Sequence, residues 1–281
     1  MSHNSPISDI GQLGLGKVAK YSGRYDPSLL QAVPRSLHRK ALAIAQQLPF
    51  AGCDVWHGYE LSWLNAKGKP VVALARYIFD ASSPNIVESK SFKLYLNSFN
   101  QTRFASSSEV QELMQKDLSM VSGGKVEIHF FSPQQWQAFP IKPIPGMCLD
   151  DLDVEIQHYQ LSPELLCVDQ TKQQVQETLY SHLLKSNCLV TRQPDWATVV
   201  VNYKGQKINH AALLQYLISF RMHDEFHEPC VERIFMDILS QCKPEYLTVQ
   251  ASYTRRGGLD INPFRTSDPT QHPEIYRINR Q

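Results

Sequence analysis

A thiol and a carboxylate lie seven residues apart at Cys188 and Asp195, within the stretch from Ser186 to Trp196. A thiolate is a good nucleophile for an electron-poor carbon, and a nearby carboxylic acid can deliver the proton that the adduct then needs. Pro194 favours an extended or turn conformation directly before the acid. The alternative is that Cys188 is a small buried hydrophobic residue, because a lone cysteine follows no spacing rule.

The densest polar cluster runs from His223 to Cys230 and holds a second histidine at His227. Two histidines four residues apart, with a cysteine three residues further on, could be taken for a zinc site. The metalloprotease pattern, however, needs a glutamate directly after the first histidine, and Asp224 stands there. The proline before the cysteine also tends to break the helix that would align the histidines. We therefore predict no metal ligands.

His227 and Glu228 are better interpreted as residues at the start of a helix that begins at Pro229. A carboxylate there can accept hydrogen bonds from two N–H donors of a guanine-like edge, and a helix N-terminus favours its ionised form. The alternative is that Glu228 is only a helix-capping acid.

A third polar stretch, Thr254–Pro263, follows a strand-like segment and carries the run Arg255-Arg256-Gly257-Gly258. Paired arginines suit bidentate phosphate binding, and the glycines allow a close approach of the backbone. Lys90 and Lys93 in the first half could supply further charge for a phosphorylated ligand. The alternative is that the loop and the lysines are ordinary solvated surface.

The elements that position these residues are predicted in two similar series. In the first half we expect strands at 55–65, 71–79, 126–130 and 151–159, with helices over 88–99 and from the Ser106 cap to Gly123-Gly124. In the second half we expect strands at 197–203 and 247–253, with helices after Asn209 and from Pro229. Residues 179–191 fit either a strand or a helix. The repeated pattern implies an α+β fold with antiparallel sheets and paired helices on one face, in units 1–168 and 169–281.

Charge and composition exclude several classes of protein. The 28 lysines and arginines nearly balance the 27 aspartates and glutamates of the 281-residue chain, so no overall field recruits nucleic acid or a membrane surface. No apolar run approaches the ~20 residues that span a bilayer, and the polar start of the chain carries no secretory signal. Six scattered cysteines without a C-x-x-C pair then indicate free thiols in a reducing cytoplasm.

The run Glu88-Ser89-Lys90-Ser91-Phe92-Lys93-Leu94-Tyr95, followed by Ser98-Phe99-Asn100, resembles the signature of a known family. That family is the NADPH-dependent 7-cyano-7-deazaguanine reductases, the nitrile reductases of queuosine biosynthesis. Further motifs fit it: Cys188 with Asp195, His227-Glu228 and Arg255-Arg256-Gly257-Gly258. The resemblance covers nearly the whole chain. It is to the long subgroup, in which two tandem tunnelling-fold (T-fold) ββααββ units divide the motifs between the halves.

The resemblance implies a role for each of these residues. Cys188 would add to the nitrile carbon to give a covalent thioimide, Asp195 would protonate the nitrogen, and His227 would take part in proton transfer. Two NADPH molecules would then reduce the thioimide to the aminomethyl product. The implied substrate-binding residues are Val87, Glu88, Ser89, His227 and Glu228, and the implied NADPH-binding residues are Ser89, Lys90, Arg256 and Gly257.

The resemblance also implies a cytoplasmic homodimer that binds a small-molecule nitrile and NADPH, without direct contact to nucleic acid or membrane, and whose active site forms where T-fold units meet. Two other functions share part of the pattern. A thiol hydrolase of nitriles or amides would use Cys188 and Asp195 with water, and a tRNA-binding module is disfavoured by the near-zero net charge. Consumption of NADPH separates the three.

Overall fold

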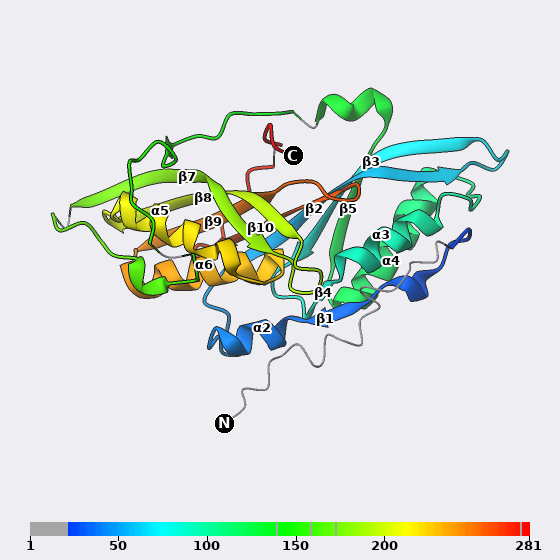
Figure 1. Ribbon diagram of the computed structural model, residues 1–281. Coiled ribbons are helices and arrows are strands. Elements are labelled where there is room, and N and C mark those ends of the chain that lie inside the picture. Colours follow the sequence, from blue (N-terminus) through cyan, green and yellow to red (C-terminus); the bar gives the residue numbers. More distant parts are fainter. Residues whose placement is uncertain (1–21, 139, 158, 172, 276) are drawn as a thin grey trace. The chain divides into compact units, whose positions relative to one another are not determined.

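The computed structural model describes residues 22–281, apart from residues 139, 158, 172 and 276 (Figure 1). The chain divides into two units, each drawn from separate parts of the sequence. Unit 1 comprises the described residues up to Ala41 together with Trp56–Ala138 and Arg256–Leu259. Unit 2 comprises the described parts of Leu42–Val55, Phe139–Arg255 and Asp260–Gln281.

Unit 1 combines antiparallel strands with two long helices, labelled in Figure 1. Its strands are β1 (Ala32–Pro34), most of β2 (Ala51–Leu64), β3 (Pro70–Asp80), β4 (Asn85–Val87) and β5 (Val126–Phe131). Its helices are α2 (Arg35–Ala41), α3 (Ser89–Ser98) and α4 (Ser107–Ser122), with the 3-10 turns η1 (Pro27–Leu29) and η2 (Pro133–Ala138). Strand β3 lies between β2 and β5, and β1 pairs with β4.

The hydrophobic periodicity explains why these segments of unit 1 fold as they do. Alternate residues of β3 are buried, as expected of a strand with one face in a core. The buried ring of Phe92 on α3 packs edge-on against Tyr77 of β3, with 5.0 Å between the ring centroids. The Ser106 side chain caps α4, and Gly123 ends this helix in a left-handed conformation. Both predicted boundaries of α4 are therefore confirmed.

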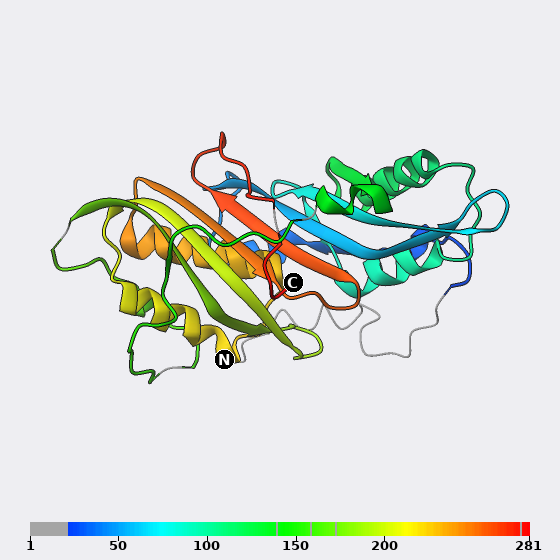
Figure 2. The ribbon, with the colours of Figure 1, turned by 90° about the horizontal axis from the view of Figure 1, so that it is seen from above.

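Unit 2 places two helices along one face of its strands (Figures 1 and 2). Its strands are β6 (Met147–Cys148), β7 (Gln174–Asn187), β8 (Pro194–Gln206), β9 (Tyr246–Tyr253) and, from Asp260 onward, β10 (Leu259–Thr266). Its helices are α5 (His210–Ser219) and α6 (His227–Cys242), with the 3-10 turns η3 (Pro163–Leu165) and η4 (Phe220–Met222). The strand order is β10-β9-β8-β7-β6, and only the pair β6–β7 is parallel. Val199, Leu214 and Ile234 are buried in the core of this unit.

Two segments differ from the predicted elements. The described residues between 151 and 159 form no strand, although Leu152, Val154 and Ile156 alternate with acids. None of these three side chains is buried, so the alternation does not mark a strand with a core face. Conversely, the predicted loop 254–263 ends inside β10, a strand whose residues are all buried. Pro263 argues against a strand there, but the pairing with β9 includes Phe264–Thr266, directly after the proline.

Two boundaries in unit 2 are fixed by the structure. Residues 179–191, which fit either element, form strand β7 as far as Asn187. The helix expected from Pro229 begins two residues earlier, at His227, with Phe226 at its N-cap. Pro229 is tolerated because the N–H groups of the first helical turn have no intrahelical partner to lose. The class is α+β, as predicted, and every helix among the described residues is too short or too polar to cross a lipid bilayer.

Candidate active site

The hairpin between β7 and β8 positions the predicted thiol and carboxylate. Cys188 is the first residue beyond β7, and its backbone N–H donates to the carbonyl of Gln193 at 2.9 Å, which extends the ladder by one pair. Arg192, in a left-handed conformation with φ of 54°, closes the turn by donating its N–H to the Cys188 carbonyl at 2.9 Å. Asp195 pairs with Ser186 across the hairpin. Residues opposite one another in an antiparallel pair share a face, so Ser186, Cys188 and Asp195 lie on the same side.

Burial separates Cys188 from the two cysteines of α6. The side chains of Cys230 and Cys242 are buried, and this burial raises the pKa of each thiol to about 12. Such thiols stay protonated near neutral pH and are poor nucleophiles. Cys188 is only partly buried. The alternative that Cys188 is a buried core residue is therefore wrong. Cys188 lies at the tip of the hairpin between β7 and β8.

A histidine and a carboxylate face each other beside this hairpin. The Nε2 of His227, the first residue of α6, lies 3.4 Å from Oδ2 of Asp195. The His227 ring also packs against Tyr253 of β9, with 4.0 Å between the ring centroids. Both partners are largely buried, with 14% of the His227 side chain and 6% of the Asp195 side chain exposed. A proton can be shared by such a pair, and a buried carboxylate with an imidazole partner suits general acid catalysis.

Glu228 is the second residue of α6, and it is buried. The N-cap of this helix is Phe226, so the alternative that Glu228 is the capping residue is wrong. Its carboxylate lies in the first turn, where the positive end of the helix dipole favours the ionised form. The hydroxyl of Ser186 is also buried, and it has no hydrogen-bond partner among the described residues. A bound ligand could satisfy this hydroxyl.

The loop before α6 is tied to the end of β7 by residues that the sequence analysis did not single out. The N–H of Asn187 donates to the His223 carbonyl at 2.9 Å, and the N–H of Glu225 donates to the Asn187 carbonyl at 3.0 Å. The Asn187 side chain donates to Asp224 at 3.0 Å. These bonds fix the residue next to Cys188 against the residues that lead into His227. No local pattern could reveal them, because the partners are 36 to 38 positions apart in the chain.

A buried ion pair anchors the same loop to α6. Arg233 donates from Nε and Nη2 to the two carboxylate oxygens of Glu225, at 2.9 and 2.8 Å, and the ring of His223 lies 2.9 Å from the same carboxylate. Burial raises the pKa of the Glu225 carboxyl, but the bonds from His223 and Arg233 outweigh it and lower this pKa to about 2. The loop is therefore held by a carboxylate that stays ionised well below neutral pH.

We expect the contribution of Glu225 to stability to be lost in acid. Because its folded-state pKa lies below its unfolded-state pKa of ~4.3, the contribution is present above pH ~4.3 and is lost as pH falls towards 2. Glu225→Gln should lower the free energy of unfolding at pH 7 by about 3–5 kcal/mol, since Arg233, which is 18% exposed, loses its partner. Urea unfolding at pH 7, 4 and 3 measures this difference, which should shrink as the pH falls.

Glu245→Gln, which removes an exposed pair with Lys204, is the matched control and should cost under ~1 kcal/mol. A difference that is independent of pH would contradict the assignment.

The predicted substrate residues of the first half lie in unit 1, whereas Cys188, Asp195, His227 and Glu228 lie in unit 2. Glu88 is buried at the N-cap of α3, where its two carboxylate oxygens accept the N–H groups of Lys90 at 2.8 Å and Ser91 at 2.7 Å. Val87 is buried at the end of β4, and Ser89 is the first residue of α3. The carboxylate of Glu88 thus organises the start of this helix.

A cavity of about 530 Å³ in unit 1 is the candidate cofactor site. Its lining combines a carboxylate, a cation, amides, backbone glycines and two leucines: Glu60, Lys93, Leu96, Asn97, Asn100, Gly257, Gly258 and Leu259. Among the residues predicted for NADPH, Gly257 lines it, and Ser89 and Lys90 begin the helix that contributes Lys93. Asn97 and Asn100 were missed as site residues, although Asn97 follows Lys93 by four residues on α3 and Asn100 comes directly after the C-cap of this helix.

The glycine pair gives this cavity its wall. Gly257 and Gly258 have φ values of 60° and 75°, and Arg256 and Leu259 exchange backbone hydrogen bonds around them. Two central residues with positive φ make a type I′ turn, which strongly favours glycine. A Cβ at Gly257 would lie 3.0 Å from Cδ of Lys93, and one at Gly258 would lie 2.5 Å from Cδ of Glu60. The lysine, the amides and the bare backbone are donors that suit a phosphorylated nucleotide.

The residues of the alternative zinc site have separate partners. His223 lies against Glu225, His227 lies against Asp195, and the Cys230 side chain is buried. Within the described part of the chain, these three do not form a group whose ligand atoms could reach one ion.

Comparisons with known proteins give two family matches. Residues 21–130 match the family described as "Nitrile reductase, 7-cyano-7-deazaguanine-reductase N-term". Residues 194–272 match the family described as "QueF-like protein". The second match contains Asp195, His227 and Glu228, and the first contains Val87, Glu88 and Lys93.

Curated relatives are similar over nearly the whole chain. A protein of Cupriavidus taiwanensis named NADPH-dependent 7-cyano-7-deazaguanine reductase is 55% identical over 269 residues, which cover 95% of this chain and 97% of the relative. A protein of the same name from Colwellia psychrerythraea is 52% identical over 279 residues, or 97% of this chain and 98% of the relative. A third, from Cupriavidus necator, is 54% identical over 269 residues, or 95% and 97%.

Proposed function

We propose that this chain, which belongs to the family of NADPH-dependent 7-cyano-7-deazaguanine reductases, reduces the nitrile of 7-cyano-7-deazaguanine to the aminomethyl group of 7-aminomethyl-7-deazaguanine. It is an oxidoreductase, and its cofactor is NADPH. One observation carries the chemical part of the proposal: Cys188, which is only partly buried, shares a hairpin face with Asp195, whose carboxylate lies against His227.

The first step forms a covalent thioimide. Cys188 reacts as its thiolate: the sulfur bonds to the nitrile carbon, and one π-bond pair of the nitrile moves to the nitrogen. The nitrogen takes a proton that Asp195 holds as a carboxylic acid, and His227 can replace this proton because its Nε2 lies 3.4 Å from the carboxylate. Covalent attachment replaces a linear, weakly electrophilic nitrile by a C=N group that accepts hydride.

The later steps return the enzyme to its starting state. NADPH, when bound, supplies one hydride, and two NADPH molecules are needed for the four-electron change from nitrile to amine. After the first hydride adds to the thioimide carbon, the Cys188 sulfur leaves with its bonding pair, and an imine remains in the pocket. After the second hydride, a proton delivered through Asp195 and His227 completes the amine. Glu228 holds the base edge of the deazaguanine, as the position of its buried carboxylate in the first turn of α6 supports.

The cofactor would be held in unit 1. Lys93 and the backbone of Gly257 and Gly258 would hold phosphate groups, and Asn97 and Asn100 would bond to ribose or amide groups. Ser89, Lys90 and Arg256 stay assigned to NADPH by the family resemblance. Val87, Glu88 and Ser89 stay assigned to the substrate by the same resemblance, and the buried carboxylate of Glu88 keeps lone pairs for a ligand beside its two backbone bonds.

The division into T-fold units, the oligomeric state, the location and the pathway are also proposed from the resemblance. The chain would consist of two tandem T-fold ββααββ units, 1–168 and 169–281, and would act as a cytoplasmic homodimer. Its product would serve queuosine biosynthesis in tRNA, without direct contact between this enzyme and nucleic acid, in line with a net charge of +1.

The stoichiometry of NADPH oxidation tests the function. Purified protein, a limiting amount of the deazaguanine nitrile and excess NADPH should consume two NADPH per nitrile and yield the primary amine. The absorbance of NADPH and mass spectrometry of the small molecule measure both quantities. Conversion of the nitrile to amide or acid without oxidation of NADPH would instead establish a thiol hydrolase. No conversion, by protein whose fold is verified by circular dichroism, would contradict both.

A further inference from the structure

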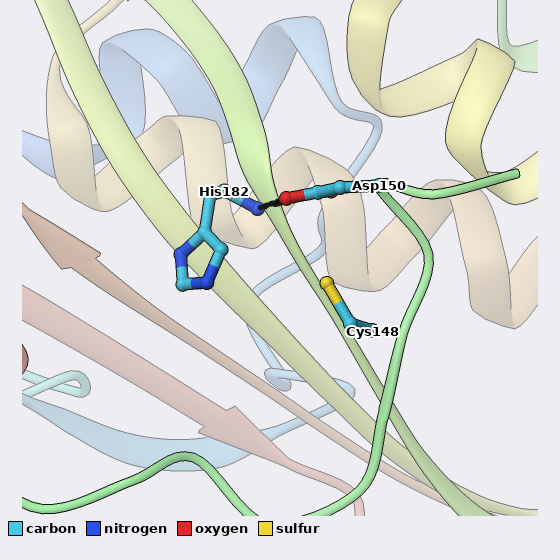
Figure 3. Close-up of side chains that lie close together, drawn as sticks. All are labelled: Cys148, Asp150 and His182. Atoms are coloured by element: carbon cyan, nitrogen blue, oxygen red, sulfur yellow. Dashed lines mark hydrogen bonds between the residues drawn. The ribbon is translucent and has the colours of Figure 1, made fainter.

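Three side chains with metal-ligating atoms gather in unit 2, outside the site described above. They are Cys148, Asp150 and His182, whose ligand atoms all lie within 4.8 Å of one another (Figure 3). His182 lies in β7, and Cys188, the first residue beyond this strand, is six residues further on, or roughly 20 Å of extended chain. The cluster is therefore separate from the reacting thiol.

The pairing of β6 with β7 brings the three residues together. Cys148 pairs with Tyr180 in a parallel ladder. Asp150 follows Cys148 by two residues, and His182 follows Tyr180 by two residues. Asp150 and His182 therefore come together just beyond the paired residues, beside Cys148. All three are partly buried, so a bound ion would be shielded from water in part.

A β-bulge orients the histidine. Ser181 pairs with Val199 and Leu184 with Ala197, so His182 and Leu183 together face the single residue Thr198. Such bulges redirect a side chain. The Nδ1 of His182 lies 2.8 Å from the hydroxyl of Thr198, which is buried. Metal-binding histidines usually have their second ring nitrogen held in this way, so Nε2 is the nitrogen available to an ion.

The carboxylate of the cluster is also held in place. One oxygen of Asp150 accepts the hydroxyl of Ser181 at 2.6 Å, and the other accepts the backbone N–H of His182 at 3.0 Å. In Figure 3 the dashed line joins this carboxylate to the backbone nitrogen of His182. The His182 N–H also reaches Oδ1 at 3.3 Å, so Oδ2 is the oxygen that keeps a lone pair for an ion. Hydrogen-bonded carboxylates of this kind are common among metal ligands.

We propose that Cys148, Asp150 and His182 bind one Zn²⁺ ion, with water in the fourth position. A thiolate and an imidazole select zinc over magnesium or calcium, and three protein ligands suit a tetrahedral ion. The ion clamps the short strand β6 to β7. The sequence predicted no metal ligands, and this proposed site would revise that expectation. The site could not be found from spacing, because one cysteine, one aspartate and a histidine 32 residues further on match no known pattern. It does not depend on the proposed nitrile chemistry.

Cobalt substitution tests the site by a readout other than activity. The full-length protein, reduced and stripped with a chelator, should bind one equivalent of Co²⁺ and develop a sulfur-to-cobalt absorption band that Zn²⁺ abolishes. Cys148→Ser should lose the band. Asp150→Asn and His182→Gln should lose stoichiometric binding. Thr198→Val should weaken Co²⁺ affinity about 10- to 100-fold, because the hydroxyl that fixes the His182 ring is gone.

Two cysteine variants are the matched controls. Cys167→Ser replaces an exposed thiol, and Cys188→Ala removes the proposed nucleophile; both should keep the band unchanged. Circular dichroism verifies that each variant folds, and Thr198→Val still tests the site if Cys148→Ser does not fold. The assignment is overturned if the wild type shows no band, if the band survives in Cys148→Ser, or if it disappears in Cys188→Ala.

Discussion

Cys188→Ala should abolish reduction of the nitrile and leave binding of the nitrile within a few-fold of wild type. In the proposed mechanism the sulfur forms the covalent link between protein and substrate, so no thioimide can form without it. The thiol contributes little to recognition, because the polar edge of the base is held by other residues. NADPH oxidation measures the loss of turnover, and calorimetric titration with the nitrile measures binding.

The control for Cys188→Ala is Cys167→Ser, because Cys167 is an exposed thiol in the same unit. Its turnover should stay within twofold of wild type. Turnover by Cys188→Ala above a few per cent would mean that hydride can add to the nitrile directly, and the covalent mechanism would have to be abandoned.

Asp195→Asn should lower kcat by about 10²–10⁴, the usual contribution of a general acid. Asparagine has nearly the size of aspartate and can still contact His227, but it cannot deliver a proton to the thioimide nitrogen. KM and the affinity for the nitrile should change little, because the loss falls on the transition state. Steady-state kinetics at saturating NADPH measure both parameters.

Glu228→Ala provides the opposite case. Its carboxylate is proposed to bind the base edge. The free energy of binding the nitrile should therefore weaken by ~2–5 kcal/mol, as expected for loss of a buried charge-assisted partner. A fall in kcat without a change in KM for Glu228→Ala, or weakened binding with normal kcat for Asp195→Asn, would show that the two roles are reversed.

Local sequence signals predicted much of the fold. The strands β2, β3, β5, β8 and β9 and the helices α3, α4 and α5 follow from the spacing of apolar residues. A serine cap and a glycine stop also mark α4, and an asparagine cap marks α5. The segment 151–159 shows the limit of this approach, because alternation alone cannot tell whether a face is buried. Strand β10 was missed for the converse reason: Pro263 lowers the local preference, and burial of every residue in β10 decides the outcome.

The candidate site was predictable only in part. Cys188 and Asp195 could be chosen for their chemistry, and His227 through the family resemblance; the hairpin explains why Cys188 and Asp195 share a face. The contacts between Asn187 and the 223–225 loop, and the ion pair of Glu225 with Arg233, depend on how distant segments pack. Sequence spacing contains no record of such contacts. The same holds for the cluster of Cys148 and His182, which needs a parallel ladder and a β-bulge to form.

Mass spectrometry of the protein mixed with nitrile in the absence of NADPH tests the central claim most directly. The thioimide should accumulate, since no hydride is available to reduce it. Wild type should gain the mass of one intact substrate, with nothing lost, on the peptide that contains Cys188, and Cys188→Ala should gain none. An adduct that persists in Cys188→Ala, or that lies on a peptide without Cys188, would contradict the assignment of the nucleophile.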